Sequence, residues 1–200
     1  MEKRGRKLIS SLNRLSTVLR TIVRNVFRLK LEPEVQILRE LIPAGSVCFD
    51  IGAGYGRYAF VLSGLVQNSG QVHCFEPLDY NLNVLETTVK FHRLRNVTIV
   101  PKALSNREGP QPLSVPIKRR TSLGAVFALS LAHLATESDD DDVRKTVPVT
   151  MLDRYVSEHK IQRLDFIKCD VEGAELLVFE GAKNTLIRFK PAVLCEAYKT

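Results

Sequence analysis

The sequence predicts an α/β fold with a doubly wound, mostly parallel sheet, and three observations carry this prediction. Short apolar runs alternate with longer helical stretches from about residue 47 to residue 195. A glycine-rich turn follows the first of these runs. The composition, 44% hydrophobic and 26% charged over 200 residues, is that of one ordinary globular domain. Strands that alternate with helices imply right-handed crossovers and a sheet covered on both faces.

The alternation fixes the expected elements in order. A short helix over residues 33–42 comes first, with Pro33 in its first turn and Pro43 at its end. The expected strands are residues 47–51, 71–75, 97–100, 165–169 and 192–195. The expected helices between and after them are residues 58–66, 79–94 and 174–189.

Residues 104–150 interrupt this rhythm with several prolines, an apolar stretch and an acidic run at 139–142. We interpret them as an insertion in which two short edge strands, 113–117 and 147–151, flank a helical lid or loop over 124–134. Insertions of this size are often functional. We therefore expect the contacts to an acceptor substrate here, and a solvated loop at the acidic run.

The net charge of +7 belongs to the N-terminal tail. Residues 1–30 carry nine basic residues and one acid, which leaves 20 basic and 21 acidic residues in the rest of the chain. A nearly neutral body argues against a nucleic-acid groove. Leucines, an isoleucine and a valine recur in the tail at steps of three and four, which predicts an amphipathic helix. Three roles stay open for it: packing on the domain or a partner, peripheral contact with an anionic membrane surface, and targeting.

Each cysteine lies inside an apolar run, and no pair has the C-x-x-C spacing of zinc or redox motifs. The four are Cys48, Cys74, Cys169 and Cys195. Reduced core cysteines favour a reducing, cytoplasmic setting, with membrane association left open through the tail.

The strongest functional signal is the turn Asp50-Ile51-Gly52-Ala53-Gly54-Tyr55-Gly56 after the first strand. Open α/β sheets bind ligands at the carboxyl ends of their strands, and glycines there let the backbone approach a ligand closely. Both dinucleotides and S-adenosylmethionine use such turns.

Three details favour S-adenosylmethionine. Arg57 stands where a dinucleotide fingerprint has its third glycine. A carboxylate at Asp50 would repel a pyrophosphate but can receive the ammonium of a methionine moiety. Glu76 follows the second strand, where a carboxylate accepts hydrogen bonds from ribose hydroxyls. A dinucleotide-dependent oxidoreductase is the disfavoured alternative.

Four segments resemble the FkbM family of S-adenosylmethionine-dependent methyltransferases from residue 46 to about residue 198. They are V-C-F-D-I-G-A-G-Y-G-R-Y, V-H-C-F-E-P, P-K-A-L-S-N-R-E-G and L-D-F-I-K-C-D-V-E-G-A-E-L-L-V-F-E-G-A. The resemblance implies a Rossmann-like class I methyltransferase fold over residues 31–200 and methyl transfer to a hydroxyl oxygen of a sugar or natural product. The implied cofactor-binding residues are Asp50, Gly52, Ala53, Gly54, Gly56, Glu76 and Ala103. Of these, Glu76 would hold the ribose and Ala103 would lie near the adenine.

The expected catalytic residues follow the fourth strand, at the same edge of the sheet. Asp170 could act as the base or contact the methionine amino group, and Glu172 could act as the base or cap the next helix. We expect Glu175 to be structural and Glu196 to face the same crevice. No metal site is expected. Of the histidines, we expect His73 to be packed and His92, His133 and His159 to lie on helical stretches.

The family fold normally ends with two strands after the fifth, whereas this sequence stops four residues beyond Glu196. We therefore expect a sheet that lacks the last strand pair, or one whose exposed side the N-terminal helix covers. The leading hypothesis is an O-methyltransferase acting on a small-molecule or glycan acceptor. The alternative is a truncated, non-catalytic methyltransferase-like interaction module.

Overall fold

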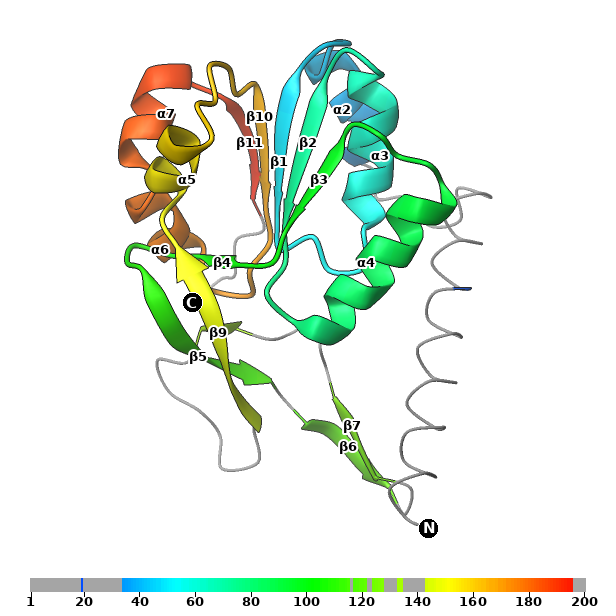
Figure 1. The fold of residues 1–200 in the computed structure, drawn as a ribbon, viewed down its shortest axis with the longest axis vertical. Coiled ribbons are helices and arrows are strands. Elements are labelled where there is room, and N and C mark those ends of the chain that lie inside the picture. The colour runs from blue at the N-terminus through cyan, green and yellow to red at the C-terminus, as the bar shows by residue number, and fades with distance from the viewer. Residues whose placement is uncertain are drawn as a thin grey trace.

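A computed structural model of the chain describes Leu19 and residues 34–115, 117–121, 124–127, 133–134 and 143–195. Its centre is a sheet of five strands in the order β11-β10-β1-β2-β3, and every neighbouring pair is parallel (Figure 1). The strands are β1 (Val47–Ile51), β2 (Gln71–Phe75), β3 (Val97–Val100), β10 (Phe166–Cys169) and β11 (Ala192–Cys195). The predicted doubly wound parallel sheet is confirmed.

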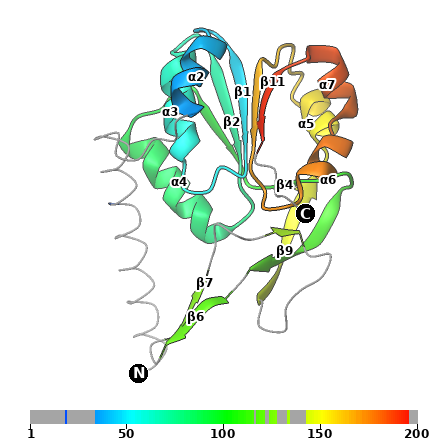
Figure 2. The same cartoon turned by 180° about the vertical axis from the view of Figure 1, so that it is seen from behind.

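Helices cover both faces of this sheet, as Figures 1 and 2 show from opposite sides. One face carries α2 (Glu34–Leu41), α3 (Arg57–Val66) and α4 (Asp79–Phe91), and the other carries α5 (Leu152–Glu158), α6 (Glu175–Glu180) and α7 (Lys183–Phe189). Successive residues of a strand point to opposite faces. Accordingly, Phe49 and Ile51 of β1 pack in the core under α5 to α7, whereas Cys48 packs in the core under α2 to α4.

A second, smaller set of strands lies beyond the carboxyl edge of the main sheet (Figure 1). It contains a four-stranded sheet in the order β4-β9-β5-β8, with β4 (Ala103–Leu104), β5 (Gly109–Val115), β8 (His133–Leu134) and β9 (Val143–Thr150). The pair β6 (Ile117–Thr121) and β7 (Gly124–Phe127) forms a separate antiparallel ribbon. We call β4 to β9 together the extension.

The extension corrects the prediction for residues 104–150. Two flanking strands were expected, but β5 and β9 pair along seven residues and belong to a sheet rather than to isolated edges. Residues 124–127 and 133–134 form strands rather than the expected helical lid or loop, and His133 lies in β8 rather than on a helical stretch. The error arises because a short apolar run has no periodicity that distinguishes a helix from a strand.

The predicted helix over residues 174–189 is divided at Gly181 and Ala182 into α6 and α7. A Cβ at Gly181 would lie 2.1 Å from the backbone oxygen of Ser105, so the chain passes the extension too closely for a side chain. Asp153 then accepts hydrogen bonds from the amides of Asn184 (3.0 Å) and Thr185 (2.7 Å), and so satisfies free amides in the first turn of α7. The helix that begins at residue 79 also ends three residues earlier than expected, at Phe91.

Several expectations lie outside the described residues. They are the tail helix over 1–30 (apart from Leu19), the acidic run 139–142 and Glu196. Within the described residues the four cysteines are free thiols, three of them buried, as expected for core cysteines. None of the described helices is long and apolar enough to cross a membrane.

Candidate cofactor and acceptor site

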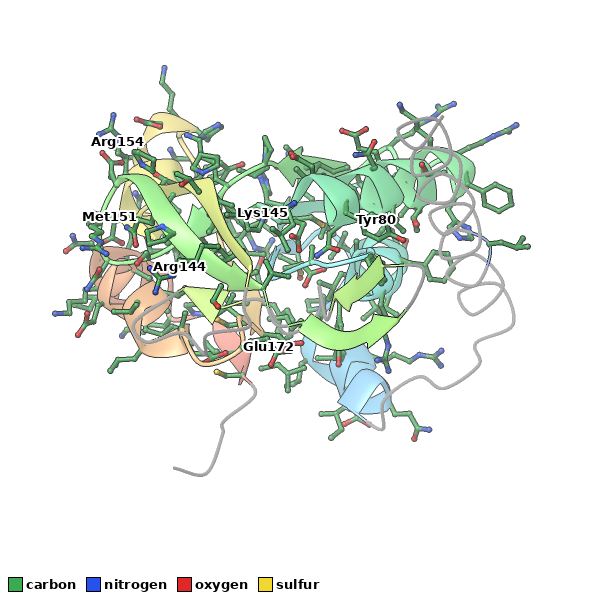
Figure 3. The ribbon with its side chains drawn as sticks, turned by 90° about the horizontal axis from the view of Figure 1, so that it is seen from below. Tyr80, Arg144, Lys145, Met151, Arg154 and Glu172 are labelled. Atoms are coloured by element: carbon green, nitrogen blue, oxygen red, sulfur yellow. The ribbon has the colours of Figure 1, made fainter. Side chains whose placement is uncertain are left out.

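A cavity of about 240 Å³ lies at the carboxyl ends of β1, β2 and β10. The chain leaves β1 toward β2 on one side and later returns to β10 on the other, so the cavity sits where the winding direction reverses. The extension closes one wall, because Leu113 of β5 and Ala103 of β4 are among the lining residues. Figure 3 views this edge of the molecule from below.

The turn after β1 is shaped by glycines in the left-handed region, with φ of 77° at Gly52 and 54° at Gly54. A Cβ at Gly52 would lie 1.9 Å from the backbone oxygen of Asp170, so Gly52 lets the turns after β1 and β10 touch. At Gly54 a Cβ would meet no atom within 4 Å. Gly54 therefore leaves open space beside the backbone, on the lining of the cavity.

Glu76 anchors the same turn from β2. Its side chain is buried; Oε1 accepts hydrogen bonds from the Leu78 amide (2.9 Å) and Asn81 Nδ2 (3.1 Å), and Oε2 accepts one from the Gly54 amide (2.9 Å). Burial raises the pKa of Glu76 to about 7, against the lowering effect of these donors. A carboxylate has about four acceptor positions, so Glu76 retains capacity for a further donor such as a hydroxyl.

Asp50, at the end of β1, is fully buried, and neither of its carboxylate oxygens has a hydrogen-bond partner among the described residues. Burial raises the pKa of Asp50 to about 6; the positive charge of Lys168 and the nearby backbone amide of Ala59 oppose this shift, and the negative charge of Asp170 adds to it. A buried carboxylate without donors is costly unless a partner satisfies it.

Lys168 and Asp170 stand beside Asp50 on the neighbouring strand. Asp50 and Lys168 are directly paired in the register of β1 and β10, and Asp170 follows two residues later on the same face. Lys168 Nζ lies 2.6 Å from Asp170 Oδ2 and 4.7 Å from the centroid of the Tyr58 ring. Asp170 Oδ1 is buried without a partner. Lys168 is thus ion-paired with Asp170 and acts on Asp50 only through its charge, and the three groups carry one negative charge in excess when all are ionised.

Beyond Asp170, Glu172 adopts a left-handed φ of 54° and lines the cavity. Glu175, in the first turn of α6, holds the turn that carries Glu172: its Oε1 accepts hydrogen bonds from the amides of Val171 (3.0 Å) and Gly173 (3.2 Å). Glu175 is therefore structural, as expected.

The structure brings nearly all the expected site residues to one cavity. Its lining includes Asp50, Gly52, Ala53, Gly54, Glu76, Ala103, Asp170 and Glu172. Gly56 is not in the lining; a Cβ there would lie 2.6 Å from Leu85 Cδ1, so Gly56 serves the packing of α3 on α4.

Sequence reasoning missed the polar residues that support these carboxylates, above all Lys168, Asn81 and Tyr58. For Lys168 a signal existed: a lysine interrupts the apolar run F-I-K-C, where every residue of the strand is buried. No comparable signal marked Asn81, because an asparagine in the first turn of a helix is usually an exposed surface residue.

The remaining candidates do not join the site. His73 is buried; its Nδ1 lies 2.8 Å from the Tyr155 hydroxyl, and burial lowers its pKa to about 4, so it is a packed residue, as expected. His92 and His159 cap the ends of α4 and α5. In the described part of the chain, no three His, Cys, Asp or Glu side chains cluster so as to hold a metal ion.

Comparison with known proteins gives the family. A model of the methyltransferase FkbM domain matches residues 50–200. The structure of an FkbM methyltransferase from Methylobacillus flagellatus KT is similar with a TM-score of 0.53 and 20% identity, covering 78% of this chain and 34% of that one. A SAM-dependent methyltransferase from Aquifex aeolicus gives a TM-score of 0.45 and 15% identity, covering 86% of this chain and 70% of that one.

At this level of identity the Methylobacillus structure supports the fold alone, and the chain spans about a third of that protein's length. A comparison with curated proteins found no match. The family model covers three quarters of the chain and includes all the carboxylates of the cavity. The chain therefore belongs to the FkbM family of S-adenosylmethionine-dependent methyltransferases.

Proposed function

We propose that this chain binds S-adenosylmethionine in the cavity and methylates a hydroxyl oxygen of a small-molecule or glycan acceptor, such as a sugar or natural product. One observation carries the proposal: a fully buried carboxylate without a donor, Asp50, lies beside an open glycine turn that Glu76 holds from the next strand. A hydrogen-bond donor or a cation from a ligand would stabilise this carboxylate, whereas a dinucleotide pyrophosphate is an anion and would be repelled by it.

The residues present fit the cofactor. Asp50 would pair with the amino-acid ammonium, because its two oxygens are otherwise unsatisfied. Gly54 would allow close approach of the ligand to the backbone, since no atom lies within 4 Å of its missing Cβ. Glu76 has acceptor capacity left for the ribose hydroxyls, and Ala103 would lie against the adenine from the extension.

When bound, the cofactor supplies a methyl group on a sulfonium, which is already a good electrophile. The protein must align the acceptor hydroxyl and remove its proton. Asp170 and Glu172 are the carboxylates of the turn after β10 that line the cavity. Asp170 already holds Lys168 through Oδ2 and offers Oδ1 as an acceptor, whereas Glu172 extends from a left-handed position.

Titration calorimetry with S-adenosylmethionine and S-adenosylhomocysteine tests the cofactor. We expect saturable heat from both ligands; no heat and no thermal shift at millimolar ligand would overturn the proposal.

Release of S-adenosylhomocysteine in the presence of hydroxylated acceptors then tests turnover. The variants Asp170→Asn and Glu172→Gln identify the general base. The residue whose substitution lowers kcat at least 100-fold, while the Kd for the cofactor stays within twofold, is the base. Cofactor binding without turnover on any acceptor would favour the interaction module.

A further inference from the structure

The extension places a lysine directly opposite a residue of the cavity lining. In the antiparallel pair of β5 and β9, Leu113 and Lys145 are direct partners. Residues directly opposite in such a pair share one face of the sheet, with Cβ atoms about 5 Å apart. Leu113 lines the cavity, so the register brings Lys145 to the cavity side of β9.

Lys145 departs from an otherwise buried pattern on that face. By the two-residue period, Lys145 shares its face with Val147 and Val149, which are buried in one cluster with Leu113 and Val115. Lys145 itself is exposed and makes no ion pair with any residue whose side chain the structure describes. In Figure 3, Lys145 lies between β9 and Tyr80 at the start of α4, whereas Arg144 lies on the other side of the strand. By sequence position Lys145 thus interrupts an apolar row of β9 formed by Val143, Val147 and Val149, on the side of the strand that faces the cavity.

The charge of β9 also differs from that of the cavity lining. β9 contains two adjacent basic residues, Arg144 and Lys145, and no acidic one. The cavity lining contains four carboxylates (Asp50, Glu76, Asp170 and Glu172) against two cations, Arg57 and Lys168, so its carboxylates are in excess. An acceptor with an anionic group would be attracted to the β9 side and repelled from the carboxylates. Its neutral hydroxyl end would then face the carboxylates that can take its proton.

We propose that the acceptor carries an anionic group, a carboxylate, phosphate or sulfate, and that Lys145 binds this group while the hydroxyl lies at Asp170 and Glu172. This inference rests on the proposed methyl transfer and adds the chemical class of the acceptor. Lys145 acts as a specificity residue: it distinguishes an anionic acceptor from its neutral counterpart by a charge-assisted hydrogen bond.

The test is the chemical reactivity of Lys145 in the protein loaded with S-adenosylhomocysteine. The rate of chemical acetylation of each lysine is measured by mass spectrometry in the presence of a neutral probe and of its anionic partner. The three pairs are glucose and glucose 6-phosphate, galactose and galacturonate, and phosphatidylcholine vesicles without and with phosphatidylglycerol. Lys183, an exposed lysine at the start of α7 that lines neither wall of the cavity, is the internal control. We expect an anionic probe to slow acetylation of Lys145 at least fivefold, its neutral partner to slow it less than twofold, and Lys183 to be unaffected.

Protection by a soluble sugar anion assigns the group to a soluble acceptor, and protection by the anionic vesicles alone assigns it to a lipid headgroup. The proposal is overturned if no anionic probe protects Lys145, or if neutral and anionic partners protect it equally. Protection by S-adenosylhomocysteine alone would also overturn it, because Lys145 would then bind the cofactor's carboxylate. As a second readout, Lys145→Gln should weaken binding of the protecting anion at least tenfold and Lys183→Gln should not. Failure of S-adenosylhomocysteine to bind would instead overturn the proposed function, so the two failures are distinguishable.

Discussion

The two sides of the cavity satisfy their buried carboxylates in opposite ways. On the β2 side, Glu76 accepts hydrogen bonds from two backbone amides and one side-chain amide. On the β1–β10 side, Asp50 has no hydrogen-bond donor among the described residues, and Asp170 leaves Oδ1 without one. Glu76 on the β2 side thus has donors within the protein and acceptor capacity to spare, whereas the β1–β10 side depends on the charge of Lys168 and on donors that a ligand brings. Substitutions should therefore act on the β2 side through lost hydrogen bonds, and on the β1–β10 side through its charge balance and its affinity for a ligand.

The largest effect is expected from removing Lys168, whose ammonium pairs with Asp170 and lies beside Asp50. Lys168→Met would leave the buried carboxylate of Asp50 next to the partly exposed carboxylate of Asp170 without this compensating charge. Breaking a buried pair in this way costs about 3 to 5 kcal/mol, and we expect the lower value because Asp170 is partly exposed. Urea denaturation measures the loss.

The double variant Asp50→Asn with Lys168→Met is the matched control. It removes one negative charge together with the positive one, so it should regain part of the lost free energy of unfolding. If Lys168→Met were as stable as the wild type, the two carboxylates would not depend on this ammonium.

Glu76→Gln should have the next largest effect, because an amide cannot accept from all three donors of Glu76. We expect the free energy of unfolding to fall by about 2 kcal/mol, the usual size for a hydrogen bond to a charged group. The same denaturation experiment with Glu86→Gln, an exposed glutamate on α4, should show almost no change. Equal effects of the two substitutions would contradict the structural role of Glu76.

The sequence predicted those site residues that lie at or just after the end of a strand, because the apolar runs mark where the strands end. Asp50, Glu76 and Asp170 were identified because each follows or ends an apolar run, and parallel strands bring their carboxyl ends to one edge. Their pairing was not predictable, because it depends on register: Lys168 lies beside Asp50 only since β10 pairs with β1 at that alignment.

The extension was predicted less well for a related reason. Its strands are stabilised by pairing between residues about 35 apart, such as Gln111 and Val147, and no local pattern reports such a contact. The break between α6 and α7 likewise reflects the close approach of Gly181 to Ser105, which are distant in the sequence. Local periodicity predicted which helices and strands form in the main sheet, whereas their boundaries depend on contacts between residues that are distant in the sequence.

A smaller effect is expected from pH on the stability of Asp50→Asn. Burial raises the pKa of Asp50 from 3.8 to about 6, so the folded wild type holds this proton at a pH where the unfolded chain has lost it. The contribution of Asp50 to stability is therefore present below pH 4 and is lost as the pH rises through 6. Asp50→Asn should become more stable than the wild type by about 3 kcal/mol above pH 7, since the shift is about two pKa units and each unit corresponds to about 1.4 kcal/mol.

The difference in Tm between the two proteins, followed from pH 4 to pH 8, checks this expectation. The difference also removes the contribution of other titrating groups, including Glu76 and His73, whose pKa values burial shifts in opposite directions. If this difference in Tm stayed constant with pH, ionisation of Asp50 would not destabilise the fold, and the expectation would be wrong.

The central claim is that the unsatisfied carboxylate of Asp50 exists to bind the ammonium of the cofactor. The most direct measurement is calorimetry of the wild type and Asp50→Asn at pH 7.5 with two ligands, S-adenosylhomocysteine and 5′-methylthioadenosine, which lacks the amino-acid part. We predict that Asp50→Asn binds S-adenosylhomocysteine at least tenfold more weakly, about 1.4 kcal/mol, and binds 5′-methylthioadenosine within twofold of the wild type. Unchanged affinity for S-adenosylhomocysteine, or an equal loss for both ligands, would contradict this account.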